Sequence, residues 1–366
     1  MKPNCRRVVL WVAAAAAVGL AATAQAAEWQ LIKTIQVPGH PINVVDFSTV
    51  DQENGLMYVS DRSNRGVDVI DTNTDTFVRR YGGFRGVYNK PETSGPNIAY
   101  REGDDLWATD APSNIKVLDV HSGKVIDTFD CKGGNARIDG AAYDPKNHVL
   151  MGESADSDIP YLCWIDTKSK KIVKNQVLMR EATAGLEGSV WDSRTDLFYL
   201  ALPEVNHGPG AIYALNPVTK EVVKKYPLPP GDSCEAGGIS LNKAQDEILV
   251  GCDTKDMTDI VSLKDGHVEQ TGILGGTDQT AYDPVTNMYF LGSRRGSKGS
   301  VLGVIDGRTH KLVAAPETAP KTHAVAVNEH NHHVYLPMEA NSKPFDNNAA
   351  KGLSCTHGCI GVYAYQ

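Results

Sequence analysis

A repeat of about 45 residues runs through this chain and constrains its fold more than any other feature. Each repeat begins with a short run of small or apolar residues that closes on an acidic or asparagine turn residue, with a shorter turn in the second repeat. The seven segments read DFSTVD, PNIAYRE, DGAAYD, EGSVWD, GGISLN, DQTAYD and HAVAVN, and from Asp46 they are spaced by 51, 42, 48, 50, 41 and 45 residues. Further strand-like segments follow each one. Four short strands per repeat of this length are typical of a β-propeller blade.

The two ends of the repeat array indicate how the ring closes. The last repeat stops after its third strand, CIGVYAYQ (359–366), and its missing fourth strand has a match in WQLIKTIQV (29–37). An open ring would leave an unpaired sheet edge, so the two terminal strands are expected to share one blade. We therefore predict an all-β fold: a seven-bladed propeller over residues 27–366, closed by both termini.

The first 26 residues have the pattern of an export signal. A basic head precedes an apolar run from Val8 to Thr23, and Ala24-Gln25-Ala26 matches a cleavage site. An uncleaved anchor is the alternative. Removal of this segment takes away three basic residues and no acidic one, so the formal charge changes from -8 to -11. We expect a periplasmic or secreted protein, whose acidity disfavours nucleic acid and anionic membranes as partners.

Six cysteines follow the signal, and an even number in an oxidising compartment predicts disulfides. Cys234 precedes the first strand of blade five and Cys252 ends the second strand. Antiparallel neighbours bring both to the same end of the blade, so we predict that they pair. Cys131 and Cys163 pair by elimination.

The longest loop of its kind spans residues 338–358. Long loops in compact domains often carry function, so we expect a lid over one end of the channel. His357 would lie on this lid, and a Cys355–Cys359 bond would stiffen it.

The residues that open the first strands form the main candidate site. In a propeller these strands line the central channel, so their starts converge at one face. The set is Asp46, Asn97, Asp139, Glu187, Gly237, Asp278 and His323. Four carboxylates in one channel mouth repel each other unless their pKa values rise, water separates them or a cation binds. Ca²⁺ or Mg²⁺ suits oxygen ligands, and His323 would also admit Zn²⁺ or Mn²⁺. A solvated polar lining is the alternative.

The repeats resemble the YVTN/NHL group of seven-bladed propellers across essentially all of residues 27–366. The similarity lies in LMYVSDRSNRGVDVIDTNTDTFV (56–78) and LWATDAPSNIKVLDVHSGKVIDTF (106–129), which show the strand, turn, strand and Ile-Asp-Thr pattern of that group. This resemblance implies the fold and says little about chemistry.

A second, local resemblance concerns the candidate site. GLEGSVWDSRTDLFYLALPE is similar to the segment that carries a metal-binding glutamate in the gluconolactonase and senescence-marker-protein family. This similarity implies Glu187, Asn97 and Asp139 as metal ligands. The sequence departs from the family pattern at Ser189, where the family has proline, at Ile98, where it has glycine, and in the blade order of the ligands.

If that resemblance extends to chemistry, the protein would hydrolyse or isomerise a lactone or ester. The metal would polarise the carbonyl and activate a water. Asp278 or Asp46 would act as general base, and His323 as ligand or proton carrier. The alternatives are a non-catalytic periplasmic propeller that binds a ligand or a partner protein, and a heavy subunit beside a quinoprotein or cytochrome. No sequence feature separates these functions.

Two further features concern the ends of the second strands and a histidine-rich turn. The second strands of most blades end on an acidic residue, whereas blade six has Arg294 and Arg295 there. In the last blade, His330, His332 and His333 occupy the turn after the first strand, which topology sends to the opposite face from the acidic ring. That turn is either a plain exposed turn or a surface metal site.

Overall fold

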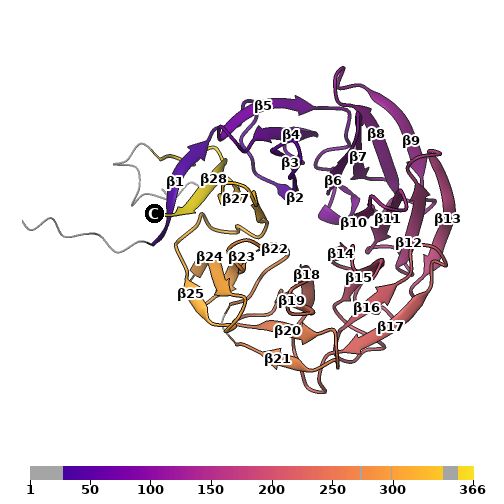
Figure 1. The fold of residues 1–366 in the computed structure, drawn as a ribbon. Coiled ribbons are helices and arrows are strands. Elements are labelled where there is room, and N and C mark those ends of the chain that lie inside the picture. Colours follow the sequence, from indigo (N-terminus) through magenta and orange to yellow (C-terminus); the bar gives the residue numbers. More distant parts are fainter. Residues whose placement is uncertain (1–27, 273, 298, 341–352) are drawn as a thin grey trace, which may run out of the picture.

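The computed structural model describes residues 28–272, 274–297, 299–340 and 353–366 and shows seven antiparallel four-stranded sheets arranged around a central channel (Figure 1). Blade one comprises β2 (Val45–Asp51), β3 (Leu56–Asp61), β4 (Gly66–Asp71) and β5 (Thr76–Tyr81). Blade two comprises β6 (Ala99–Glu102), β7 (Asp105–Asp110), β8 (Asn114–Asp119) and β9 (Val125–Asp130), and the short 3-10 helix η1 (Pro91–Thr93) precedes it. Blade three comprises β10 (Gly140–Asp144), β11 (Val149–Ser154), β12 (Tyr161–Asp166) and β13 (Lys171–Leu178).

The remaining blades follow the same order from the channel outward. Blade four comprises β14 (Ser189–Asp192), β15 (Leu197–Leu202), β16 (Ala211–Leu215) and β17 (Val222–Pro227). Blade five comprises β18 (Ala236–Asn242), β19 (Glu247–Cys252), β20 (Thr258–Ser262) and β21 (Val268–Gln270). Blade six comprises β22 (Thr280–Asp283), β23 (Met288–Gly296), β24 (Gly299–Asp306) and β25 (Leu312–Ala314). Blade seven comprises β26 (Ala326–Val327), β27 (Val334–Met338), β28 (Cys359–Tyr365) and β1 (Trp29–Ile35).

The predicted closure is confirmed in blade seven. The N-terminal strand β1 pairs antiparallel with the C-terminal strand β28, from Trp29 opposite Tyr365 to Ile35 opposite Ile360. The backbone groups of Glu28 and Gln366 exchange two further hydrogen bonds, of 2.7 and 3.0 Å. Strands β1 and β28 therefore lie side by side on one side of the ring, as Figure 1 shows, and the seventh sheet has four strands.

The turn residues that mark the repeat explain the first hairpin in six of the seven blades. In blade three the Asp144 carboxylate accepts hydrogen bonds from the backbone nitrogens of Lys146 and Asn147, at 2.9 and 3.0 Å. The turn then closes on His148 with a φ of 55°, a left-handed conformation that glycine and asparagine adopt most easily. The corresponding left-handed residues in other blades are Gly55, Asp196, Asp246, Asn287 and His332.

Apolar side chains fill the spaces between neighbouring blades. Seven buried clusters are present, and each joins the facing sheets of two adjacent blades. Between blades three and four, for example, the rings of Trp164 and Phe198 meet edge to face at 5.7 Å. Burying one large apolar side chain contributes about 1.5–3 kcal/mol, so these interfaces hold the ring together.

All three predicted cysteine pairs form disulfides: Cys131–Cys163, Cys234–Cys252 and Cys355–Cys359. The predicted export signal, residues 1–26, and most of the predicted lid, residues 341–352, lie outside the described residues. Among the residues described, no helix is long and apolar enough to cross a membrane.

Candidate functional site

The starts of the first strands surround a cavity of about 560 Å³ at the mouth of the channel. Five of the seven predicted ring residues line this mouth cavity: Asp46, Asp139, Glu187, Gly237 and Asp278. His323 lines an adjoining cavity, and Asn97 is buried behind the wall and lines neither. Four carboxylates from blades one, three, four and six therefore share one space, while the roles predicted for them remain predictions.

The mouth cavity is strongly acidic. Two arginines, Arg137 and Arg294, face eight carboxyl side chains. The carboxyls are those of Asp46, Asp139, Glu187, Glu204, Asp232, Glu235, Asp253 and Asp278. A cavity with this lining attracts cations, because opposite charges are drawn together more strongly where protein excludes water.

A buried arginine joins three of the predicted site residues. Arg62, which is 4% exposed, contacts the Asp46 carboxylate and the Asn97 side-chain oxygen through one guanidinium nitrogen. The same nitrogen lies 3.9 Å from the nearer Asp139 oxygen. Burial and the nearby Arg137 lower the pKa of Arg62 to about 9, which still leaves the guanidinium charged at neutral pH. Arg62 therefore places a fixed positive charge behind the cavity wall.

Arg137 neutralises the next part of the ring. Its guanidinium hydrogen bonds to one Asp139 oxygen and forms a 3.1 Å ion pair with Asp156. Burial, followed by the repulsion from Asp139, raises the pKa of Asp156 to about 6. The second oxygen of Asp139 is buried and accepts no hydrogen bond from a described residue.

Arg294 holds the carboxylate of Asp278. Two guanidinium nitrogens donate to the two Asp278 oxygens at 2.8 Å, and one of them also reaches Asp253 at 3.0 Å. Burial raises the pKa of Asp278, although His323 and Arg294 act in the opposite direction. Both oxygens of Asp278 are thus engaged, and Asp46 is held by Arg62. These contacts place neither of the two predicted general bases in a free position.

Glu187 differs from the other predicted carboxylates because, among the residues described, no arginine forms a direct ion pair with it. It lies just before β14, where a side chain at Gly188 would meet the backbone of Gly238 at 2.7 Å, so the close approach of blades four and five fixes its position. Among the residues described, none forms a hydrogen bond or ion pair with its carboxylate. Burial, followed by repulsion from Asp139 and Asp278, raises the pKa of Glu187 well above its usual value, although the charge of Arg137 acts in the opposite direction. Glu187 therefore keeps its proton to a higher pH than an exposed glutamate.

The adjoining cavity, of about 530 Å³, has the opposite charge. Arg294, Arg295, Lys321 and His323 line it with a single carboxylate, Glu339. The Nδ1 atom of His323 lies 2.7 Å from the backbone oxygen of Lys321, so this nitrogen donates and Nε2 is left to interact with a ligand. Arg294 lines both cavities, so the acidic and basic regions adjoin at this residue.

The predicted metal ligand Asn97 has both side-chain atoms engaged by the protein. The side-chain oxygen of Asn97 accepts from Arg62, and its nitrogen donates to the backbone oxygen of Ile138 at 2.7 Å. A metal site needs at least three ligand atoms from histidine, cysteine or carboxylate side chains close together. Within the described part of the chain, one group of three such atoms lies within 4.8 Å of one another, and it belongs to Cys234, Cys252 and Asp259. Asn97 does not fit as a metal ligand in this arrangement, and no step is derived through a metal.

The arginines are the site residues that the sequence reasoning missed. Arg62 directly follows Asp61 at the end of β3, and Arg294 lies near the end of β23, so both belong to the mouth ends of second strands. Arg294 was recognised only as an interruption of an acidic pattern. An arginine at this position of a blade is the signal that could have indicated a counter-charge for the acidic ring.

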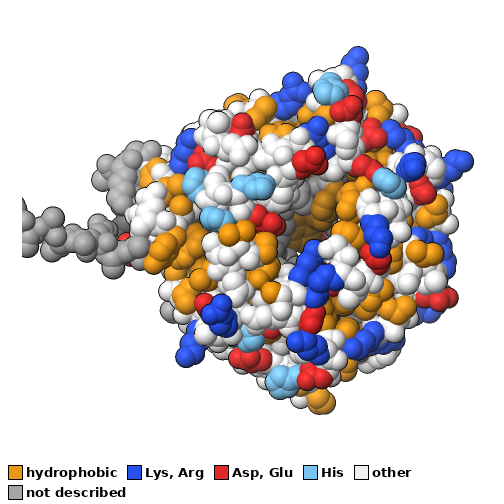
Figure 2. All heavy atoms as spheres, viewed as in Figure 1, with side chains coloured by type: hydrophobic (Ala, Val, Ile, Leu, Met, Phe, Trp, Pro, Cys, Tyr) orange, Lys and Arg blue, Asp and Glu red, His pale blue; other side chains and the backbone are white. Residues whose placement is uncertain are grey.

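The histidine turn of blade seven contacts the neighbouring blades. His332 lies 2.8 Å from Asp283 of blade six, and His333 lies 3.2 Å from Asp75 of blade one. The Nε2 atom of His330 lies 3.0 Å from the backbone oxygen of Gln52. Figure 2 shows histidine and acidic side chains close together on the face that it presents, around a central hollow. These contacts give the histidines a structural explanation as links between blades.

Comparison with known proteins supports the fold and leaves the family open. No protein-family model matches the chain, and no curated protein sequence matches it. Among solved structures it is similar to a chain in "Crystal Structure of Mitotic Checkpoint Complex", with a TM-score of 0.64 and 10% sequence identity over 99% of this chain and 100% of that chain. At this identity the similarity shows the propeller fold alone, and the YVTN/NHL and gluconolactonase resemblances are not confirmed.

Proposed function

We propose that this protein binds a small polar molecule with a positively charged group in the mouth cavity. The observation that carries the proposal is the unpaired carboxyl of Glu187 in a cavity of eight carboxyls and two arginines. Asp46, Asp139 and Asp278 each form an ion pair with an arginine. A cationic group next to Glu187 would supply the direct ion-pair partner that it lacks among the described residues and would displace its proton.

The adjoining basic cavity favours a ligand that also carries a negative group. Arg295 and Lys321 lie there, and Arg294 lies between the two cavities. A zwitterion could place its cationic end near Glu187 and its anionic end toward these side chains. Ligands with two negative groups would be repelled by the acidic lining, which sets the expected order of affinities.

Four molecules with the same four-carbon chain test this proposal by isothermal titration calorimetry: 4-aminobutyrate, putrescine, 1,4-butanediol and succinate. We expect the two cationic molecules to bind at least tenfold more tightly than the diol and succinate, about 1.4 kcal/mol. Their binding should release a proton, seen as a heat that changes with the ionisation enthalpy of the buffer. Glu187→Gln should abolish the proton release, whereas Glu221→Gln, the same change at an exposed residue of the β16–β17 turn, should not.

Equal affinities for the four molecules would contradict the proposal. So would a proton release that is unchanged in Glu187→Gln, because another group would then be responsible.

A catalytic form of this proposal is hydrolysis or isomerisation of a lactone or ester. One observation favours it: a carboxyl that keeps its proton in a ligand-sized cavity is suited to general acid catalysis. Turnover of lactones by the unchanged protein, lost in Glu187→Gln, would support catalysis. Metal analysis of the unchanged protein and of Glu187→Gln would test the predicted metal site. Without turnover, the alternatives are a periplasmic binding or scaffold propeller and a subunit beside a quinoprotein or cytochrome.

Export is a further part of the proposal. Three disulfides suit an oxidising compartment, and the sequence of residues 1–26 matches a signal. Sequencing the N-terminus of the protein purified from its natural host tests this, with cleavage after Ala26 as the expected result.

A further inference from the structure

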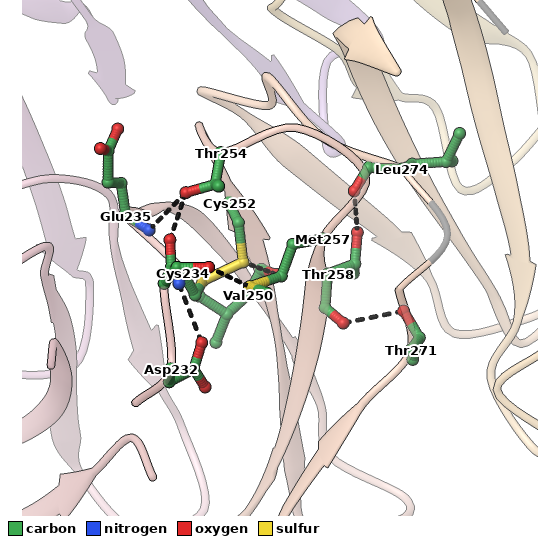
Figure 3. The surroundings of a disulfide bond; sticks show 11 residues. Asp232, Cys234, Glu235, Val250, Cys252, Thr254, Met257, Thr258, Thr271 and Leu274 are labelled. Atoms are coloured by element: carbon green, nitrogen blue, oxygen red, sulfur yellow. Dashed lines mark hydrogen bonds between the residues drawn. A yellow bond between two sulfur atoms is a disulfide. The ribbon is translucent and has the colours of Figure 1, made fainter. Parts of the chain in front are cut away.

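The Cys234–Cys252 disulfide lies beside a buried aspartate, Asp259, whose polar neighbour is a second carboxyl, that of Asp232. Cys234 precedes β18, Cys252 ends β19, and Asp259 lies on β20 opposite Val250. The two sulfurs and one Asp259 oxygen all lie within 4.8 Å of one another. Figure 3 shows the surroundings of this disulfide, where Asp232 accepts a hydrogen bond from the Cys234 backbone nitrogen at 2.8 Å.

Asp259 offers two buried carboxyl oxygens to a ligand. It is fully buried, and neither of its oxygens accepts a hydrogen bond from a described residue. One oxygen of Asp232 is also buried and without a donor. Buried carboxyl oxygens are normally satisfied, because burying a polar group without a partner costs free energy. A disulfide offers them no donor, and the polar group that acts on Asp259 is the neighbouring carboxyl of Asp232.

We propose that reduction of the Cys234–Cys252 disulfide creates a zinc site. The two thiolates and the Asp259 carboxylate supply three ligands, and Asp232 or water supplies the fourth. Tetrahedral zinc with Zn–S distances of about 2.3 Å places two sulfurs roughly 3.8 Å apart. Breaking the S–S bond allows the two sulfurs to separate to this distance. The Asp259 oxygen already lies within 4.8 Å of both sulfurs, so all three atoms can reach one zinc ion.

The chemistry requires a two-electron reductant of the dithiol class. The dithiol is oxidised to a cyclic disulfide, while Cys234 and Cys252 are reduced to two thiols. Zinc then displaces the two thiol protons, because thiolates are the ligands that it binds. In the oxidised protein the sulfurs have no thiolate form, so zinc binding depends on the redox state.

The position of the site provides access for the reductant and the ion. Cys234, Asp232 and Glu235 line the mouth cavity, so the disulfide lies behind its wall. The other two disulfides take part in no such group of ligand atoms among the residues described. Zinc uptake is therefore expected at one of the three reduced cysteine pairs.

The test uses the full chain reduced with dithiothreitol, a dithiol, and then freed of reductant without oxygen. We expect one equivalent of Zn²⁺ to bind after reduction and none before. Co²⁺, used as a spectroscopic substitute, should give the intense visible bands of a tetrahedral site and sulfur-to-metal charge transfer from two thiolates. Asp259→Asn should weaken zinc binding at least tenfold, and Cys234→Ser should abolish it.

The double variant Cys131→Ser/Cys163→Ser is the matched control, since it removes one cysteine pair but retains the proposed site. It should still bind one equivalent of Zn²⁺ after reduction. Circular dichroism of each reduced protein establishes that the β-sheet signal is retained. Several results would overturn the proposal: no zinc uptake after reduction, equal uptake by the oxidised protein, unchanged affinity in Asp259→Asn, or loss of binding in the Cys131/Cys163 control.

Discussion

Replacing Arg62 with methionine tests whether this arginine holds the acidic mouth together. The substitution keeps a long side chain but removes the positive charge between Asp46, Asn97 and Asp139. Asp46 is 7% exposed and Asp139 5% exposed, so water cannot replace the lost contacts easily. Removing one partner of a buried ion pair costs about 3–5 kcal/mol, because the other charge stays buried without compensation. We expect a loss of this size for Arg62→Met.

The assay is denaturant-induced unfolding at pH 7 under conditions that preserve the disulfides. Asp46→Asn and the double variant Arg62→Met/Asp46→Asn complete a thermodynamic cycle. The double variant has neither charge of the closest pair, so its loss should be smaller than the sum of the single losses by about 1–3 kcal/mol. Arg308→Met, at an exposed arginine of the β24–β25 turn, is the control and should change stability by less than about 0.5 kcal/mol.

A loss below about 1 kcal/mol for Arg62→Met, similar to that of Arg308→Met, would refute the reasoning. Additive losses in the cycle would also refute it, because they would show that Arg62 and Asp46 do not interact.

Three further predictions concern stability. Burial, followed by the carboxylate of Asp232, raises the pKa of Asp259 to about 8, so folding takes up a proton and stability falls as pH rises from about 4 to 8. Asp259→Asn should therefore raise the melting temperature at pH 8 and have little effect at pH 4. Burial lowers the pKa of His310, but the hydrogen bonds and charges of Glu269 and Glu247 outweigh it and raise this pKa. The contribution of His310 to folding stability is therefore complete below about pH 6.5 and is lost as pH rises through the folded-state pKa. Thermal melts of His310→Gln should show a loss at pH 5.5 that disappears by pH 9. Leu31→Ala, in the strand that closes the ring, should cost about 2–5 kcal/mol, with faster amide exchange in β28 as the measurement.

The fold could be predicted because its signals are local. The turn at Asp144 and the apolar strand that follows it have counterparts in six blades, and both depend on neighbouring residues. The closure of the ring followed from one missing strand at the C-terminus and one extra strand at the N-terminus. The Cys234–Cys252 pair followed from antiparallel pairing within one blade.

The chemistry of the site depends on contacts between distant segments. Arg62 and Asp139 are in different blades, and nothing in either segment indicates that the guanidinium turns toward the ring. Asn97 occupies the expected ring position, yet its amide binds Arg62 and the backbone of Ile138 and does not line the cavity. The position of a residue in its strand predicted the place of its backbone in the ring. The orientation of its side chain depends on contacts with residues of other blades.

The most direct test of the proposed cation site is the titration of Glu187 itself. Carbon-13 labelling of glutamate side chains and comparison with Glu187→Gln would identify its carboxyl resonance. We predict that this carboxyl titrates well above the usual range of a glutamate, and that saturation with putrescine shifts its titration to lower pH. An ordinary glutamate titration, unchanged by putrescine, would contradict the proposal that Glu187 is the unpaired carboxyl that receives a cationic ligand.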